Sequence, residues 1–541
     1  MASHVVIWFV MFSFVLCYAK SVRNHNLLCD SDMSNYKDAL SKGILFFEGQ
    51  RSGKLPANQR VKWRADSALS DGKIENVNLS GGYYDAGDNV KFGWPMAFSI
   101  SLLGWAATEY KNELGRADQL SNLRAAIRWG TNFLLRAHTS STKFYTQVGD
   151  GNRDHECWER PEDMDTPRTL YSITSTSPGT EVAAEAAAAL AVGSIVFRQV
   201  DSNYSATLLR HSKLLFEFAD KYRGSYQGSC PFYCSFSGYQ DELLWAAAWL
   251  YKATGDSPYL NYVSTNENWS QTVSEFSWDN KFAGAQTLLA KVKYAGYADC
   301  VLKKSNYIRL IGCVRMTHET RQEFLAGKTK LSKYKNGVDS FVCALMPGSS
   351  SVQIKTTPDV IGIAGGLMYT RDSSNLQYVT SASMILLVYS NILTQARTDG
   401  VQCGSVKFSA SKIKTFAKSQ VDYILGNNPM NMSYMVGFGT KYPTKVHHRG
   451  ASIPSIRTHP AKVGCSDGYS TWYYSSKPNP NTHVGAIVGG PDSNDKFTDS
   501  RTDFSHAEPT TYMNAAFVGS VAALVGQSKQ DCSHLNSVVD Y

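Results

Sequence analysis

The chain contains the run Glu181-Val-Ala-Ala-Glu-Ala-Ala-Ala-Ala-Leu-Ala-Val192, in which strong helix formers follow one another without a break. Ser177 and Pro178 precede it and suit the cap and first turn of a helix spanning residues 178–199. A soluble helix with alanine on nearly every face is usually buried between neighbours, because small side chains permit close packing. The run therefore predicts an inner helix surrounded by other helices.

Further helical patterns extend from this run toward both ends of the chain, whereas clear alternating strands are scarce. The joint at Ala253–Pro258 predicts a tight helical hairpin: Gly255 ends one helix, Ser257 caps the next and Pro258 occupies its first turn. Twelve helical segments are expected, at 36–49, 95–113, 118–138, 178–199, 205–222, 239–254, 257–266, 282–291, 323–334, 374–397, 409–425 and 509–527.

Three connections between the expected helices greatly exceed the usual length of about two to eight residues. They span 51–94, 139–176 and 428–508, and we expect them to build the working face of the protein. With 541 residues and 43% apolar content, the chain can bury a large core. Because no Pro/Ser-rich linker or low-complexity tail interrupts it, we predict a single domain over residues 20–541 without a separate binding module.

The charge pattern does not favour nucleic acid as a partner. The formal net charge of +8 comes from only 18% charged residues, with no long basic run. Eleven tryptophans and 30 tyrosines point instead to sugars, whose apolar faces stack on flat rings exposed in a groove. Most aromatic side chains in any protein belong to the core, so this composition is suggestive only together with a site.

Residues 4–19 form an apolar run that is short for a membrane span and ends in small residues. We interpret residues 1–19 as a secretory signal, with Cys17 and Ala19 before the cut; a retained anchor is the alternative, since no Lys or Arg precedes the run. No other stretch is expected to span a bilayer. We therefore predict a secreted, extracellular protein of the apoplast or cell wall, without membrane attachment after signal removal.

Ten cysteines remain after removal of the signal, and an oxidising compartment favours disulfides whose pairing the sequence leaves open. Cys230 and Cys234 bracket Pro231-Phe232-Tyr233; a local bridge is at least as well supported as a metal site, because no histidine lies nearby. Secretion also agrees with sequons at Asn78, Asn203, Asn268 and Asn431.

The loop Gly81-Gly82-Tyr83-Tyr84-Asp85-Ala86-Gly87-Asp88 places two carboxylates three residues apart on a turn broken by glycines and flanked by aromatic residues. Such a loop is poorly suited to core packing. Glycines let the backbone bend sharply and approach a ligand, so Asp85 and Asp88 are candidates for holding and deprotonating one water molecule. A calcium loop or a solvated turn is the structural alternative.

A second cluster runs from Ser433 through Lys441 to His447-His448-Arg449-Gly450. Paired histidines suggest a metal, but adjacent side chains point apart on most backbones, and no Cys/His cluster at ligand spacing accompanies them. We therefore expect no metal here, and interpret His447 and Arg449 as donors to hydroxyl groups or to a carboxylate.

A third cluster, containing Asp499 and Glu508, crosses from an acidic loop into the last expected helix. Glu508-Pro509 falls at the start of that helix, where a carboxyl group often serves only as a cap or a partner of the helix dipole.

Taken together, these stretches resemble glycoside hydrolase family nine, and within it the plant secreted endo-β-1,4-glucanases. The resemblance covers nearly all of residues 34–527, and its motifs include the 81–88 loop, the His447–Arg449 and Asp499–Glu508 stretches, and the runs Cys157–Arg168 and Tyr239–Trp245. It implies an all-α fold, an (α/α)6 barrel of six inner and six outer helices with an open cleft. It also implies a β-1,4-glucan substrate, no cofactor, and a monomer.

By the same resemblance, hydrolysis inverts the anomeric carbon, with Asp88 as the base on water, Asp85 assisting it and Glu508 protonating the departing oxygen. Inversion needs the two groups roughly 6.5–9.5 Å apart, so that water fits beside the sugar. We therefore expect the surroundings of Glu508 to raise its pKa and those of Asp88 to keep it ionised.

The remaining site residues follow from the resemblance as well. His447, Arg449 and Asp499 are expected to hold substrate and fix the carboxylates, and Tyr84 to contact substrate beside the paired aspartates.

Two segments interrupt the resemblance and look like insertions, at 292–322 and 359–364. The first carries six Lys/Arg against two Asp/Glu, adds Cys300 and Cys313, and has edges compatible with translated intron sequence. The expected catalytic groups all lie outside both segments.

Two rival functions remain at this stage. One is a secreted glucan-binding protein of the same fold, catalytically impaired by the insertions. The other is a polysaccharide lyase on a similar helical barrel, which the paired acidic groups make less favoured than hydrolysis.

Overall fold

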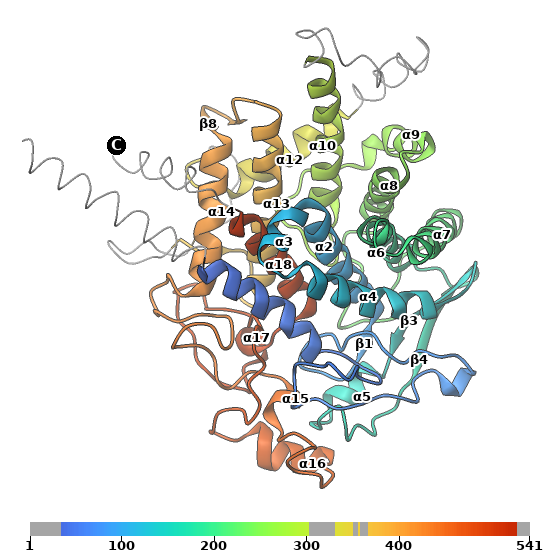
Figure 1. Cartoon of the computed structure of the whole chain (residues 1–541), viewed down its shortest axis with the longest axis vertical. Coiled ribbons are helices and arrows are strands. Elements are labelled where there is room, and N and C mark those ends of the chain that lie inside the picture. The colour runs from blue at the N-terminus through green and yellow to red at the C-terminus, as the bar shows by residue number, and fades with distance from the viewer. Residues whose placement is uncertain (1–33, 302–330, 350–354, 357–365, 527–541) are drawn as a thin grey trace, which may run out of the picture.

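The computed structural model describes residues 34–301, 331–349, 355–356 and 366–526 (Figure 1). The alanine-rich run lies in helix α6 (Thr180–Phe197), in which every residue except Ile195 is buried. Five other inner helices are α2 (Gly93–Glu109), α8 (Gln240–Thr254), α10 (Phe282–Val301), α13 (Leu376–Gln395) and α18 (Thr511–Val525). Each inner helix contacts the next: α2 contacts α6, α6 contacts α8, α8 contacts α10, α10 contacts α13, α13 contacts α18, and α18 contacts α2. The inner helices therefore close a ring.

Six outer helices cover this ring: 34–49, α4 (Leu120–Ala137), α7 (Ser202–Lys221), α9 (Ser257–Thr265), α12 (Ser332–Leu345) and α14 (Ala410–Leu425). In α7 the buried side chains include Leu208, Leu215 and Ala219, which repeat at helical spacing and form one apolar stripe. Each of the five outer helices from α4 onward contacts an inner neighbour, and Gly43 of helix 34–49 approaches Val518 of α18. The expected (α/α)6 barrel is confirmed.

Most expected segments fall on these helices, but the ninth is misplaced. Its described part, 331–334, only begins helix α12, which continues to Leu345; residues 323–330 lie outside the described residues. Helix α10 also runs ten residues beyond its expected end at 291, into the suspected insertion, where Val292 and Tyr294 pack against the core. The rest of that insertion, 302–322, and the segment 359–364 lie outside the described residues, as does the apolar run 4–19.

Apart from α10 and α12, the helix ends differ from expectation by up to about four residues. Gly255 ends α8 in the left-handed conformation with φ 76°, as expected, and Pro258 lies in the first turn of α9. The residue at the N-cap of α9 is however Asp256 rather than Ser257, and Gly179 precedes α6 instead of Ser177.

A small antiparallel sheet, missed in the sequence, lies beside the ring. It contains β1 (Lys91–Phe92), β2 (His138–Ser140), β3 (Lys143–Val148) and β4 (Leu170–Thr174), and β3 pairs with each of the other three. Two further antiparallel pairs join β5 (Lys355–Thr356) to β6 (Met368–Tyr369), and β7 (Val401–Cys403) to β8 (Val406–Phe408). Such short strands leave little alternation to detect.

Short helices punctuate the long connections, which gather at one end of the barrel (lower part of Figure 1). In the connections 51–94, 139–176 and 428–508 these are η1 (Lys73–Glu75), α5 (Gly151–His155), α15 (Arg449–Ser452), α16 (Cys465–Asp467), the π-helical η4 (Gly468–Tyr473) and α17 (Phe504–Ala507). Two more short helices, α3 (Lys111–Arg116) and η2 (Glu267–Trp269), lie in shorter connections between barrel helices.

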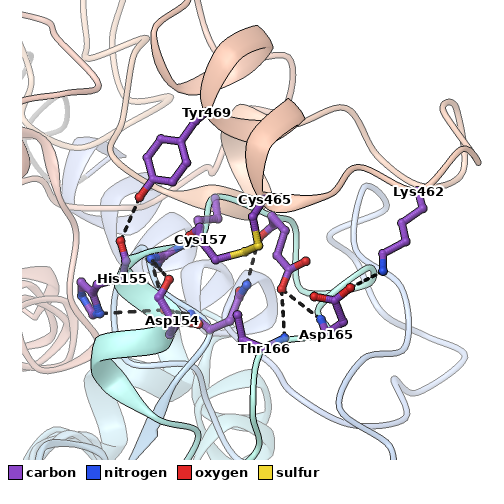
Figure 2. The surroundings of a disulfide bond; sticks show 11 residues. Asp154, His155, Cys157, Asp165, Thr166, Lys462, Cys465 and Tyr469 are labelled. Carbon is purple, nitrogen blue, oxygen red and sulfur yellow. Dashed lines mark hydrogen bonds and ion pairs between the residues drawn. A yellow bond between two sulfur atoms is a disulfide. The ribbon is translucent and has the colours of Figure 1, made fainter.

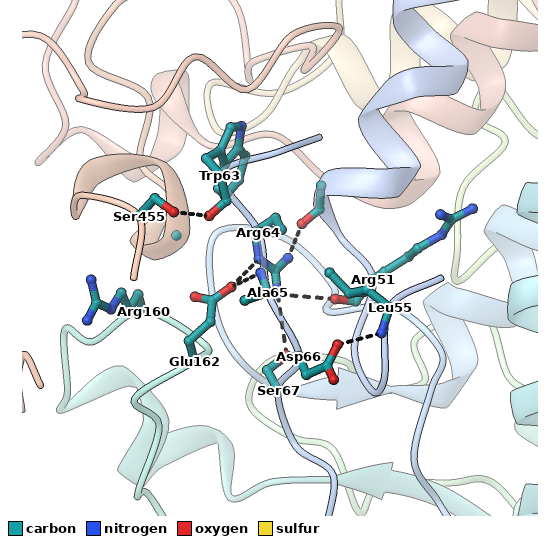
Figure 3. Close-up of polar contacts among 12 residues, drawn as sticks. Arg51, Leu55, Trp63, Arg64, Ala65, Asp66, Ser67, Arg160, Glu162 and Ser455 are labelled. Atoms are coloured by element: carbon teal, nitrogen blue, oxygen red, sulfur yellow. Dashed lines mark hydrogen bonds and ion pairs between the residues drawn. The ribbon is translucent and has the colours of Figure 1, made fainter. Parts of the chain in front are cut away.

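The buried side chain of Arg64 ties three of these connections together (Figure 3). Its Nε pairs with Glu162 at 2.8 Å, and its Nη2 donates to the carbonyl oxygen of Arg51 at 3.2 Å. Ser455 then donates to the carbonyl oxygen of the neighbouring Trp63 at 2.8 Å. These contacts connect the loops that follow residues 50, 150 and 450 to one another.

Disulfides join Cys157 to Cys465, Cys230 to Cys234, and Cys343 to Cys403. The prediction of a local bridge between Cys230 and Cys234 is confirmed. Helices α6 and α13 are long and apolar enough to cross a membrane, but their apolar windows are 94% and 89% buried inside the barrel, which explains their composition.

A buried ion cluster joins three inner helices. The fully buried ammonium of Lys281 lies 3.2 Å from Glu242 of α8 and 3.6 Å from Glu185 of α6, and the Lys281 backbone donates to Asp241 at 2.6 Å. Burial raises the pKa of Glu242 well above its usual value, and the neighbouring Asp241 adds to this. The lysine therefore compensates carboxyl groups that would otherwise resist ionisation in the core.

We predict that Lys281→Met destabilises the protein by about 3–5 kcal/mol near neutral pH, because buried carboxylates lose their cation. Since the folded pKa of Glu242 is raised, the loss should shrink as pH falls and the carboxyls take up protons. Denaturant unfolding at several pH values measures this. Lys213→Met, at a half-exposed pair with Asp256, is the control and should cost less than about 1 kcal/mol; equal losses in both variants would contradict the prediction.

Candidate active site

The loop 81–88 is anchored from behind by its two tyrosines. Tyr83 donates to the carbonyl oxygen of Ala126 on α4 at 2.7 Å, and Tyr84 donates to Ser67 Oγ at 2.9 Å. Only 1% and 2% of these side chains are exposed. This placement differs from the expected contact between Tyr84 and substrate: the ring is under the loop, where it supports the aspartates.

Backbone hydrogen bonds bring the three sequence clusters together at this loop. The Gly87 N–H donates to Glu508 Oε1 at 2.9 Å, and the Gly87 carbonyl accepts from the Arg449 N–H at 2.9 Å. In addition, Thr511 donates to the carbonyl of Asp85 at 3.0 Å. The residues expected to cooperate in catalysis are thus neighbours, although about 360 to 420 positions separate them in the chain.

Gly87 permits this close approach. A Cβ atom at residue 87 would lie 2.2 Å from the carbonyl oxygen of His447 and 3.0 Å from Glu508 Oε1. The first distance is far shorter than a normal contact with backbone, so any side chain would push the 447–449 segment away from the loop.

The three carboxyl groups have different surroundings. Asp85 and Asp88 are buried, with exposed fractions of 4% and 5%, and Glu508 is half-buried. Burial, reinforced by Asp154, raises the pKa of Asp88 to about 6. Burial, reinforced by Asp88, raises the pKa of Glu508 to about 8. The raised pKa of Glu508 agrees with expectation, whereas Asp88 is raised as well and stays ionised only above about pH 6.

Asp85 has the driest position of the three. Burial and the adjacent Asp88 raise its pKa well above the usual value. Its Oδ2 accepts a hydrogen bond from the hydroxyl of Tyr233, and this hydrogen bond acts to lower the pKa of Asp85. Its Oδ1 is buried and has no hydrogen-bond partner among the described residues.

Asp154 and His155, which end α5 beside the site, belong to none of the three sequence clusters (Figure 2). Asp154 is buried and pairs with Arg449 at 3.2 Å, while Tyr469 donates to the carbonyl of His155 at 2.8 Å. Their position in the 139–176 connection and the acidic character of Gly149-Asp150-Gly151 were the only available signals.

The side chains of His447 and Arg449 contact different parts of the protein. The half-buried ring of His447 hydrogen-bonds through Nδ1 to the carbonyl of Arg501 at 2.7 Å and packs edge-on against Trp158. Burial lowers the pKa of His447 to about 3, so the ring is neutral. Arg449 is buried and donates to the backbone carbonyls of Cys157 at 2.9 Å and Asp154 at 2.8 Å. Arg449 thus holds the backbone at Asp154 and Cys157 in place beside the site.

Asp499 is half-exposed and fixes the segment that leads to His447. It accepts from the backbone N–H and hydroxyl of Thr444 at 2.9 and 2.7 Å, and from the Lys445 N–H at 2.9 Å. The described contacts of Asp499 therefore give it a positioning role next to the site.

One group of three potential metal ligands touches the site: Asp88, Asp154 and His155 offer atoms within 4.8 Å of one another. Arg449 already places a guanidinium beside Asp154, which disfavours a second cation there. His448 is turned away from His447, because its Nδ1 accepts from Ala451 and its Nε2 bonds to Gln50. The paired histidines therefore do not share a ligand site.

Two buried aspartates next to a glutamate whose pKa of about 8 exceeds the pKa of about 6 of Asp88 form an arrangement typical of glycoside hydrolases that use an acid and a base. The chain belongs to glycosyl hydrolase family 9, whose sequence pattern matches residues 36–521. An endoglucanase of Phaseolus vulgaris is 65% identical over 494 residues, 91% of this chain and 92% of that protein. Endoglucanase 20 of Arabidopsis thaliana is 65% identical over 91% of this chain and 95% of its own.

Solved structures agree with these relatives. The endoglucanase of the termite Nasutitermes takasagoensis is 38% identical with a TM-score of 0.74, covering 91% of this chain and 98% of that chain. Endoglucanase CelQ of Clostridium thermocellum, solved with cellobiose and cellotriose, is 31% identical with a TM-score of 0.70, covering 91% and 70%. The predictions of the family, the barrel and an endo-β-1,4-glucanase are confirmed.

We predict that Gly87→Ala lowers kcat by at least about 10²-fold, because displacement of the 447–449 segment misplaces the catalytic groups. Initial rates on soluble carboxymethylcellulose measure the loss. Gly115→Ala is the matched control, since a Cβ there meets nothing within 4 Å, and it should retain the wild-type rate. Wild-type kcat in Gly87→Ala would show that the close approach is dispensable.

Proposed function

We propose that this enzyme hydrolyses internal β-1,4-glucosidic bonds of cellulose and related β-glucans with inversion at the anomeric carbon. Asp88 acts as the base that deprotonates water, Asp85 assists by holding that water, and Glu508 is the acid that protonates the departing oxygen. The observation that carries this proposal is the order of the pKa values, about 6 for Asp88 and about 8 for Glu508. Between these values one group is ionised and the other protonated.

The surroundings of the carboxyls suit a sugar substrate. Exposed or half-exposed rings cluster beside His447: Phe504 is 59% exposed and Tyr474 is 70% exposed, next to Tyr473. Flat rings of this kind stack on the apolar faces of sugar units. The bound sugars of CelQ are cellobiose and cellotriose, which supports a β-1,4-linked glucan as the substrate of this chain.

Secretion and a monomeric state belong to the same proposal. The asparagines of all four sequons, Asn78, Asn203, Asn268 and Asn431, are exposed and so accessible to glycosylation. The three disulfides among the described residues fit an oxidising compartment. A purely glucan-binding role is not favoured, because the relatives are endoglucanases and the expected acid and base are both present.

Hydrolysis of soluble carboxymethylcellulose tests the activity: viscosity should fall faster than reducing ends appear, as expected for internal cuts. Proton NMR of the first products tests the stereochemistry, and α-configured ends are expected. β-configured first products would overturn inversion, and binding without new ends would favour the non-catalytic alternative. Unsaturated ends absorbing in the ultraviolet would indicate a lyase.

We predict a bell-shaped dependence of kcat/KM on pH. The rate should rise as pH increases through about 6, where Asp88 loses its proton, and fall as pH increases through about 8, where Glu508 loses its proton. Initial rates from about pH 4 to about pH 10 measure both limbs. A maximum near about pH 4 would contradict this assignment.

Asp154→Asn tests the origin of the acid limb. Removing the negative charge of Asp154 leaves Arg449 uncompensated, and both changes favour ionised Asp88, so the acid limb should move to lower pH. Asp163→Asn is the matched control, because Asp163 pairs with Arg160 instead, and its profile should stay unchanged. A shift toward higher pH in Asp154→Asn would contradict the proposed cause.

We predict that Glu508→Gln lowers activity on glucan by about 10²–10⁴-fold but retains most activity on an aryl β-cellotrioside with a dinitrophenolate leaving group, which departs without protonation. Asp88→Asn is the comparison variant and should lose activity on both substrates. Equal losses of Glu508→Gln on both substrates would remove Glu508 from the acid role.

A further inference from the structure

A five-residue loop closed by the disulfide Cys230–Cys234 lies between helices α7 and α8. We call residues 230–234 the disulfide loop. Besides the disulfide, Ser229 forms an isolated antiparallel bridge with Tyr233, and the N–H groups of Phe232 and Tyr233 both donate to the Ser229 carbonyl at 3.0 Å.

The two ring-bearing residues of the loop reach different parts of the candidate site. The hydroxyl of Tyr233 donates to Asp85 Oδ2, and its ring packs on Trp278 with centroids 4.7 Å apart. The ring of Phe232 stacks on His155 with centroids 4.5 Å apart and an interplanar angle of 27°. Tyr233 thus contacts one of the paired aspartates, and its neighbour Phe232 contacts the end of α5.

The outer side of the disulfide loop faces solvent. Cys230 and Pro231 are exposed, whereas 7% of Tyr233 is exposed. The connection containing the loop, 222–239, holds no helix or strand of its own. A buried tyrosine at the tip of an exposed, irregular connection needs a covalent or hydrogen-bonded constraint to keep one orientation.

We propose that the Cys230–Cys234 disulfide is a positioning element of the active site: it fixes Tyr233 against Asp85 and Phe232 against His155. This inference rests on the proposed function, because it assigns Asp85 to the catalytic apparatus. Without the disulfide, the loop samples other conformations and Asp85 loses its Tyr233 hydrogen bond, while its Oδ1 has no partner among the described residues. The water held by Asp85 and Asp88 is then less well oriented.

The test compares Cys230→Ser/Cys234→Ser with Cys343→Ser/Cys403→Ser as the control. The control disulfide joins α12 to β7, which carry no residue of the candidate site. We expect kcat of the first variant to fall about 10–100-fold with KM nearly unchanged, and the control to retain kcat within about two-fold. Thermal unfolding of both variants shows whether each is folded at the assay temperature.

A double-mutant cycle with Tyr233→Phe separates positioning from general destabilisation. If the disulfide acts through Tyr233, its removal in the Tyr233→Phe background should lower kcat by less than about two-fold further. Full additivity of the two losses, or wild-type kcat in a folded Cys230→Ser/Cys234→Ser variant, would overturn the inference. An inactive wild type would instead refute the proposed hydrolysis. The wild-type assay alone shows that failure, so it is distinguished from a failure of this inference.

Mild reduction of the folded wild type covers the case in which the serine variants fail to fold. Dithiothreitol passes two electrons and two protons to the disulfide, which leaves two protein thiols and a cyclic disulfide in the reagent. Alkylation and mass spectrometry should find Cys230 and Cys234 reduced first, because Cys230 is exposed. Cys343 and Cys403 are 5% and 1% exposed, and Cys157, which is bonded to the half-buried Cys465, is 3% exposed. kcat should fall as this bond opens and recover on reoxidation; full activity with the bond open would overturn the inference.

Discussion

The contact between the backbone of Gly87 and the chain at 447–449 and 508 is the constraint on which the site depends. Three segments from distant parts of the sequence meet there at hydrogen-bond distance, and the missing side chain of Gly87 leaves room for them. The barrel makes this meeting possible, because α2 and α18 are neighbours in the inner ring and each begins close to one of these segments. Helix packing thus fixes the relation between Asp88 and Glu508.

Burial has opposite consequences for chemistry and stability. It raises the pKa of Asp88 to about 6 and that of Glu508 to about 8, and this difference separates the proposed base from the proposed acid near neutral pH. Carboxyls with raised pKa values also lower the stability of the folded state as pH rises. Other interactions must therefore stabilise the loops around the site. Arginine side chains supply many of them by donating to backbone carbonyls of long loops that lack regular partners: the buried Arg64, Arg160, Arg449 and Arg501, and the half-buried Arg168.

Local pattern predicted the helices well where it was strong. The alanine-rich run could only be a buried helix, and α6 lies in the inner ring. The pattern failed at α12, where apolar side chains such as Tyr334, Val338 and Phe341 are diluted by lysines and an asparagine. It also failed for the four-stranded sheet, because pairing with β3 rather than alternation stabilises those short strands.

The sequence by itself determined the family, the barrel and the residue types of the site, because motifs such as Asp85–Asp88 and Asp499–Glu508 are local. Only the tertiary structure decided which of these residues face one another. Tyr84 is buried and donates to Ser67, and the pKa of Asp88 depends on burial and on Asp154, 66 positions later in the chain. Burial and charge are properties of a three-dimensional environment, and no local pattern contains them.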